Sequence, residues 1–129
     1  MTASDKMSRI DHVMLPVADI ERAIAFYSDA FGMAVIERRD DGDRRFAHVG
    51  YGPRGEHVTI ELIEQRNVAV IVGNGHFCLR LPELSEWVAT RELAGQVFAK
   101  PHGLHDGRIL RAWIRDSDGH LVEVADVAS

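Results

Sequence analysis

The order of predicted elements occurs twice along this chain, and that repetition constrains the fold more than any other feature of the sequence. An alternating segment rich in strand-forming residues, 10–17, is followed by a helical pattern that begins after Asp19 and ends at Gly32. Three more strand-like segments follow, at 34–39, 45–49 and 58–63. The first half therefore predicts the order β-α-β-β-β.

The second half predicts the same order. A strand-like segment, 75–81, precedes a helical pattern over 84–94 that Gly95 ends. A short strand-like segment and two clearer ones complete it, at 96–99, 108–115 and 120–125. Two copies are too few for a solenoid, so we predict two fused βαβββ modules in an α+β fold. The predicted divisions are a tail 1–8, a first module 9–66, a linker 67–74 and a second module 75–126.

A histidine and a glutamate hold matching places in the two halves. His12, in the first predicted strand, lies 49 positions before Glu61, and His76 lies 47 positions before Glu123. Because side chains alternate across a strand, each of the four lies opposite the aliphatic residues of its own strand. A single residue of this kind usually faces solvent, so the prediction depends on the joint pattern. If the aliphatic faces pack under the helices, the other face gathers two imidazoles and two carboxylates, which suit a divalent transition metal.

Composition narrows the classes of protein. The chain has 129 residues, of which 46% are apolar, and its net charge of −5 has no basic stripe, which argues against a nucleic-acid partner. Cys78 is the only cysteine, which excludes an internal disulfide and a thiolate metal cluster. No apolar run is long enough to span a bilayer or resembles a signal peptide. We therefore expect no membrane partner and a cytoplasmic protein.

Four segments in this order resemble the vicinal-oxygen-chelate superfamily, which has the glyoxalase/bleomycin resistance/dioxygenase fold, and within it glyoxalase I (lactoylglutathione lyase). They are DHVMLPVADIERAIAFYSDAFGM, VGYGPRGEHVTIEL, GNGHFCLRL and RDSDGHLVEV, and the resemblance covers residues 9–126. It implies that the two βαβββ modules form an open barrel-like sheet around a metal site. The implied ligands of one divalent ion (Ni, Co or Zn) are His12, Glu61, His76 and Glu123. It also implies a homodimer with the active site at or near the interface between modules.

The resemblance implies a metal-dependent lyase or isomerase that acts in methylglyoxal detoxification. The expected reaction converts a small 2-oxoaldehyde–thiol adduct, the hemithioacetal of methylglyoxal and glutathione, into lactoylglutathione. Substrate oxygens on the metal acidify the adjacent C–H, a carboxylate removes the proton, and the metal stabilises the enediolate. We expect Glu123 to be the base, with Glu61 as ligand and partner base.

The chain departs from the family in its expected substrate site. The arginine and the asparagine that meet glutathione in glyoxalase I are replaced here by Pro16 and Gln65, and His48 stands where an aromatic pocket residue is expected. The catalytic core therefore matches the family better than the glutathione site does. The candidate substrate-binding residues are Trp113, His48, Gln65, Arg80 and Arg111. The other histidines are expected to face water in or beside turns, namely His57, His102, His105 and His120.

Two other classes of function, a different enzymatic reaction and ligand binding without catalysis, are compatible with the same fold. Thiol transferases of the fosfomycin type and ring-cleaving dioxygenases use two histidines and one glutamate, so Glu61 at the fourth position argues against them. A non-catalytic, bleomycin-type binding protein needs no metal, so four ligand positions argue against that function too.

Overall fold

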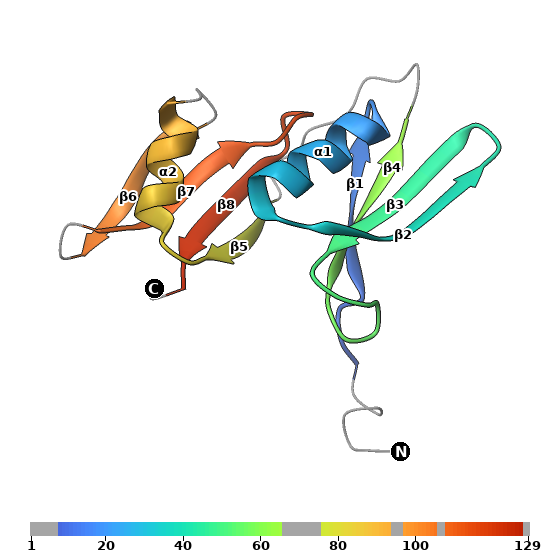
Figure 1. The fold of residues 1–129 in the computed structure, drawn as a ribbon, viewed down its shortest axis with the longest axis horizontal. Coiled ribbons are helices and arrows are strands. Elements are labelled where there is room, and N and C mark those ends of the chain that lie inside the picture. Colours follow the sequence, from blue (N-terminus) through green and yellow to red (C-terminus); the bar gives the residue numbers. More distant parts are fainter. Residues whose placement is uncertain (1–7, 66–75, 94–96, 106–107, 128–129) are drawn as a thin grey trace. The chain divides into compact units, whose positions relative to one another are not determined.

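The computed structural model describes residues 8–65, 76–93, 97–105 and 108–127. Its contacts divide the chain into two units, 1–70 and 71–129, and each unit is described by itself. The first unit contains β1 (His12–Val17), α1 (Ile20–Phe31), β2 (Ala34–Asp41), β3 (Arg44–Gly50) and β4 (Thr59–Glu64) (Figure 1). The second contains β5 (Phe77–Leu81), α2 (Leu84–Leu93), β6 (Val97–His105), β7 (Arg108–Arg115) and β8 (Leu121–Asp126). The predicted α+β fold with two βαβββ modules is confirmed.

Each unit folds into a four-stranded sheet with the same topology. The strand orders are β1-β4-β3-β2 and β5-β8-β7-β6. In both sheets the first strand pairs in parallel with the last, and the other neighbours are antiparallel. The connection between these parallel strands consists of the helix and the two middle strands, which is long enough for the crossover that a parallel pair requires. This topology places the first and the last strand of each unit side by side.

One face of each sheet packs against the helix of the same unit. Helix α1 contacts β3 and β4, and α2 contacts β6, β7 and β8. Alternation along the strands directs the aliphatic side chains to this face, as the sequence predicts. The fully buried core side chains include Val17, Ile20, Ala23, Tyr27 and Leu62 in the first unit and Leu84, Val88, Ile114, Val122 and Val124 in the second. The opposite face of each sheet is left for polar residues.

A buried carboxylate at the end of the last strand anchors the helix in each unit. The backbone N–H of Ile20 donates to Oε2 of Glu64 at 2.9 Å, and the N–H of Leu84 donates to Oδ2 of Asp126 at 3.0 Å. A negative charge at the N-terminus of a helix is also favourable for the helix dipole. The two helices are therefore tied to equivalent positions of the two sheets.

The expectation that the remaining histidines face water is confirmed for His57, which is exposed, and is wrong for His120. The strand expected at 96–99 is longer than predicted, because β6 extends to His105 and pairs with β7. The side chains of His102 and His105 lie outside the described residues, so their exposure to water stays a prediction. His120 is buried instead of facing water, because Oδ1 of Asp116 accepts its backbone N–H at 2.9 Å and closes the turn before β8. The strand expected at 58–63 begins one residue later, at Thr59, and Val58 is exposed.

The predicted divisions of the chain stay predictions. Residues 1–7 of the tail and the whole linker lie outside the described residues. The open barrel-like arrangement around a metal concerns the relation between the two units and also stays a prediction. Neither helix in the described part of the chain has the length and hydrophobicity that a membrane span needs.

Gly32, which ends α1, provides a test of the local fold. Its φ of 68° and ψ of 21° lie in the left-handed region, and its N–H donates to the carbonyl of Ser28. A Cβ at this position would meet no atom within 4 Å, so a substitution is strained by its backbone conformation alone. We expect Gly32→Ala to lower the free energy of unfolding by about 1 kcal/mol. Gly32→Asn should cost less, because asparagine tolerates this conformation; equal losses in denaturant titrations would contradict this account.

The helix anchor of the first unit is also testable. Glu64→Leu leaves the N–H of Ile20 without its acceptor in a buried place, and we expect a loss of about 1–3 kcal/mol of unfolding free energy. Glu64→Gln keeps an acceptor oxygen and should lose clearly less. Urea titration of both variants measures the difference, and a Gln variant as unstable as the Leu variant would exclude the hydrogen bond as the cause.

Candidate metal-binding site

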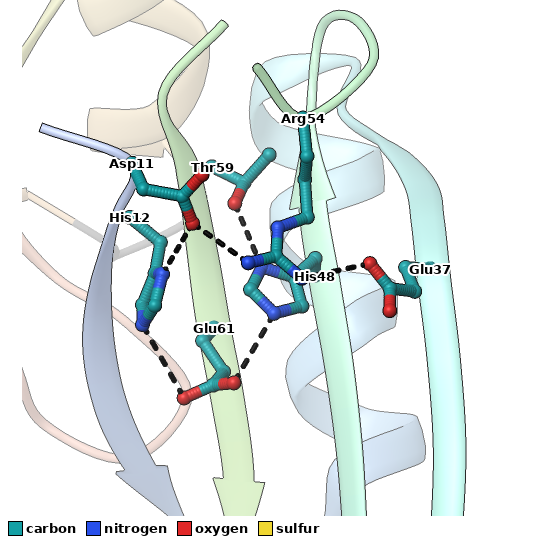
Figure 2. Close-up of polar contacts among 7 residues, drawn as sticks. All are labelled: Asp11, His12, Glu37, His48, Arg54, Thr59 and Glu61. Atoms are coloured by element: carbon teal, nitrogen blue, oxygen red, sulfur yellow. Dashed lines mark hydrogen bonds and ion pairs between the residues drawn. The ribbon is translucent and has the colours of Figure 1, made fainter. Parts of the chain in front are cut away.

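In the first unit, parallel pairing brings His12 and Glu61 together on the face opposite the helix. The register aligns His12 with Thr59 and Met14 with Glu61, so the histidine and the glutamate are diagonal neighbours. Nε2 of His12 lies 3.7 Å from Oε1 of Glu61 (Figure 2), which is longer than a hydrogen bond. Both side chains are partly exposed, 34% for His12 and 18% for Glu61. The two atoms therefore face each other without a direct bond.

Asp11 orients the ring of His12. Nδ1 of His12 donates to Oδ2 of Asp11 at 2.7 Å, so Nδ1 carries the proton and Nε2 keeps its lone pair on the side of Glu61. This hydrogen bond, together with one from Arg54, holds the pKa of the Asp11 carboxyl below its ordinary value. A carboxylate on the outer nitrogen is the usual partner of a metal-ligating histidine. Nε2 of His12 is thus prepared to bind a cation.

His48 lies on β3 directly opposite Glu61. Its Nε2 lies 3.1 Å from Oε2 of Glu61, and its Nδ1 lies 2.8 Å from Oγ1 of Thr59 (Figure 2). Burial, and secondarily the charge of Arg54, lowers the pKa of His48, which favours the neutral ring. The ring is only 5% exposed, and both its nitrogens are held by protein groups. Contact between His48 and substrate, predicted from the sequence, remains untested.

Arg54 links the two sides of this cluster. It donates to Oδ2 of Asp11 at 2.8 Å and to Oε2 of Glu37 on β2 at 2.9 Å. These hydrogen bonds lower the pKa of Glu37 and raise that of Arg54. A small pocket beside the cluster is lined by Glu37, Arg39, Phe46, His48, Arg54 and Glu61.

The sequence did not identify Asp11, Glu37, Arg54 or Thr59 as members of this cluster. Strand parity could have placed Glu37 and Thr59 on the site face, since they pair with His48 and His12. Arg54 lies between β3 and β4, where no periodicity predicts the direction of a side chain. Only the folded chain shows its two partners.

The second unit repeats the pair with His76 and Glu123. Nε2 of His76 lies 3.3 Å from Oε1 of Glu123, and their side chains are 39% and 12% exposed. Trp113 on β7 stands opposite Glu123 in register and packs edge-on against the ring of His76, with 4.7 Å between ring centroids. Trp113 therefore lies beside the predicted ligands, where its role as a pocket wall stays a prediction.

Arg111 holds the other oxygen of Glu123. Its Nη1 donates to Oε2 of Glu123 at 2.5 Å from a position two residues before Trp113 on the same face of β7. Cys78, on β5, is the register partner of Glu123 on β8. The pKa of its thiol is raised, mainly by burial and next by the negative charge of Glu123. A raised thiol pKa argues against a nucleophilic role for Cys78.

The two remaining predicted substrate residues, Arg80 and Gln65, make hydrogen bonds to the backbone of their own unit. Arg80 is exposed on β5, and its Nη1 donates to the carbonyl of Asp126 at 3.3 Å. Gln65 follows β4, and its backbone N–H donates to the carbonyl of Val17 at 2.8 Å. Their contact with substrate stays a prediction.

The donor atoms of both pairs fit a divalent metal. Ligand atoms about 2.0–2.2 Å from one ion are roughly 3–3.5 Å apart when they are adjacent in its coordination shell. The observed separations, 3.7 Å and 3.3 Å, are close to this range. Among the described residues no group of three or more His, Cys, Asp or Glu could hold a metal. Each unit thus presents two candidate ligands, and the convergence of all four on one ion stays a prediction.

Two βαβββ units, each with a parallel first and last strand and a His–Glu pair on one face, define a paired-module class of proteins. The chain belongs to the Glyoxalase/Bleomycin resistance protein/Dioxygenase superfamily, whose family model matches residues 9–124. This match confirms the resemblance seen in the sequence.

The curated relatives of similar sequence share the name lactoylglutathione lyase. The lactoylglutathione lyase of Salmonella typhimurium is 32% identical over 124 residues, which cover 92% of this chain and 92% of the relative. A putative lactoylglutathione lyase of Brassica oleracea is 32% identical over 122 residues, covering 90% of this chain, which spans only 43% of that relative. The solved structure of the glyoxalase I of Leishmania major has a TM-score of 0.80 at 25% identity and covers 93% of this chain and 87% of its own.

The pairing of Arg111 with Glu123 can be measured in the metal-free protein. We expect Arg111→Met to lower the unfolding free energy by about 1 kcal/mol, near the low end for a charged hydrogen bond because solvent screens the exposed part of the arginine. In a Glu123→Gln background the same substitution should cost much less. Arg108→Met, at the exposed start of the same strand, is the control. Equal losses in both backgrounds would show that the arginine acts elsewhere.

Proposed function

We propose that this chain is a divalent-metal-dependent lyase or isomerase of the glyoxalase I type. One observation carries the proposal: each unit presents an imidazole nitrogen and a carboxylate oxygen 3.3–3.7 Å apart on the face opposite its helix. The names of the relatives support the reaction type. The protein would act in the cytoplasm in the detoxification of methylglyoxal.

His12, Glu61, His76 and Glu123 would hold one ion of Ni, Co or Zn. Imidazole and carboxylate ligands suit all three metals. The bound ion would supply Lewis acidity, which polarises two oxygens of the substrate and acidifies the C–H between them. A homodimer, with the site at or near the interface between modules, is part of this proposal.

The residues of the chain would move one proton. In a 2-oxoaldehyde–thiol adduct, Glu123 would remove the proton from the carbon that bears sulfur and hydroxyl. It would return this proton to the neighbouring carbonyl carbon, and the hydrogen of the original hydroxyl would pass to the former carbonyl oxygen, so that a thioester and a new hydroxyl form without any other reactant. Glu61 would be a ligand of the ion and the partner base.

The thiol part of the substrate is the least constrained feature. Pro16 and Gln65 depart from the family's glutathione contacts, as the sequence shows. The Leishmania major glyoxalase I is described as trypanothione-dependent, so the thiol differs between members of this fold. Trp113, Arg111 and Arg80 would contact the substrate, and the two arginines would suit an anionic group.

The test combines metal content with turnover. The full-length protein is stripped with a chelator and reloaded with Ni, Co, Zn or Mn, and then assayed with methylglyoxal and a panel of thiols by the ultraviolet absorbance of the thioester. We expect Glu123→Gln to reduce turnover by about 10²–10⁴-fold while circular dichroism stays unchanged. Glu86→Gln, an exposed carboxylate on α2, is the matched control.

Each outcome separates one part of the proposal. A protein that binds no metal would overturn it entirely. A protein that binds metal but turns over no thiol adduct would keep the site and exclude the reaction. Undiminished turnover in Glu123→Gln would exclude Glu123 as the base.

A further inference from the structure

The two oxygens of Glu61 have different neighbours. Oε1 faces Nε2 of His12 at 3.7 Å, and Oε2 lies 3.1 Å from Nε2 of His48. A carboxylate can only accept, so Nε2 of His48 must carry the hydrogen of the shorter contact. The carboxylate is therefore held by one oxygen while the other points toward His12.

Thr59 holds the other nitrogen of His48, once Glu61 has required the hydrogen to be on Nε2. The hydroxyl of Thr59 lies 2.8 Å from Nδ1 of His48, and the two side chains are 1% and 5% exposed. A neutral imidazole with hydrogen on Nε2 has an acceptor at Nδ1, so the hydroxyl must donate to it. Thr59, His48 and Glu61 thus form a directed chain of hydrogen bonds that ends beside His12 (Figure 2).

We infer that His48, with its ring held at Nδ1 by Thr59, is a positioning residue that holds Oε2 of Glu61 and directs Oε1 toward a metal ion bound by His12. The inference rests on the proposed function, since it assumes that Glu61 is a ligand. It gives His48 a role different from the substrate contact that the sequence suggested.

The second unit shows why this role is specific. The position opposite Glu123 is occupied by Trp113, and the second oxygen of Glu123 is held by the cation of Arg111. The permanent charge of an arginine beside a carboxylate opposes the arrival of a metal ion, whereas an imidazole can orient the carboxylate through a single hydrogen bond. Loss of the donor at His48 should therefore weaken metal binding, as the loss of such outer partners generally does.

The experiment compares variants of the full-length protein that differ in one hydrogen bond. His48→Phe keeps a planar ring without a donor, whereas His48→Gln places an amide N–H near the position of Nε2. Thr59→Val removes the hydroxyl, and Thr59→Ser keeps it. Val49→Ala, on the same strand with its side chain on the helix face, is a control for packing alone.

Affinity for Ni and Zn is measured by competition with a chromophoric chelator, and the ligand field by the visible spectrum of bound Co(II). We expect His48→Phe to weaken binding by about 10–100-fold and to change the spectrum. Thr59→Val should weaken it less, and His48→Gln, Thr59→Ser and Val49→Ala should stay close to the unmodified protein. In the metal-free protein, NMR of the imidazole nitrogens should show His48 with hydrogen on Nε2.

The outcomes distinguish this inference from the function on which it rests. An unmodified protein that binds no metal would overturn the proposed function and the inference together. Metal binding that is equally tight in His48→Phe and the unmodified protein, with the same spectrum, would overturn only the inference. Hydrogen on Nδ1 of His48 would do the same. If His48→Phe does not fold, the Thr59 variants provide the test. A metal affinity of Thr59→Val equal to that of Thr59→Ser would then overturn the inference.

Discussion

The parallel pairing of the first and last strand is the constraint on which each unit depends. It joins segments that are far apart in the sequence, so the chain must cross over through a helix before the pair can form. The pairing of β1 with β4 places His12 beside Glu61, and the pairing of β5 with β8 does the same for His76 and Glu123. Without these two pairings the histidine and the glutamate of each unit would not lie side by side.

Much of this arrangement could be predicted from the sequence, because it follows from regular alternation. A period of two assigns Glu61 and Glu123 to the face opposite the core, and the repeated order of elements predicts two modules. The sequence predicts too short a strand for β6, because Pro101 and Gly103 interrupt the strand-like alternation and the pairing of β6 with β7 is irregular. The hydrogen bond between Arg54 and Asp11 could not be predicted, because Arg54 lies in the loop between β3 and β4, whose course no periodicity describes.

The two His–Glu pairs have the same candidate ligands but differ in the residue that holds the second oxygen of the glutamate. In each, one carboxylate oxygen faces the histidine and the other is held from a neighbouring strand. The second oxygen is held by a buried imidazole in the first unit and by a partly exposed guanidinium in the second. The two carboxylates are therefore not equivalent, although the fold repeats, and this difference arises from single residues on β3 and β7.

The short distance along the chain between Glu61 and Glu64 has a consequence for how such proteins diverge. Because the two glutamates are three residues apart, their side chains point to opposite faces of β4. Glu64 accepts the hydrogen bond from the N-terminus of α1, and Glu61 lines the small pocket beside His48. Asp126 and Glu123 repeat the arrangement. A lineage can therefore exchange the outward-facing residues for new chemistry while the inward-facing ones preserve the scaffold. A superfamily whose name joins lyases, drug-resistance proteins and dioxygenases is what such a division of tasks would produce.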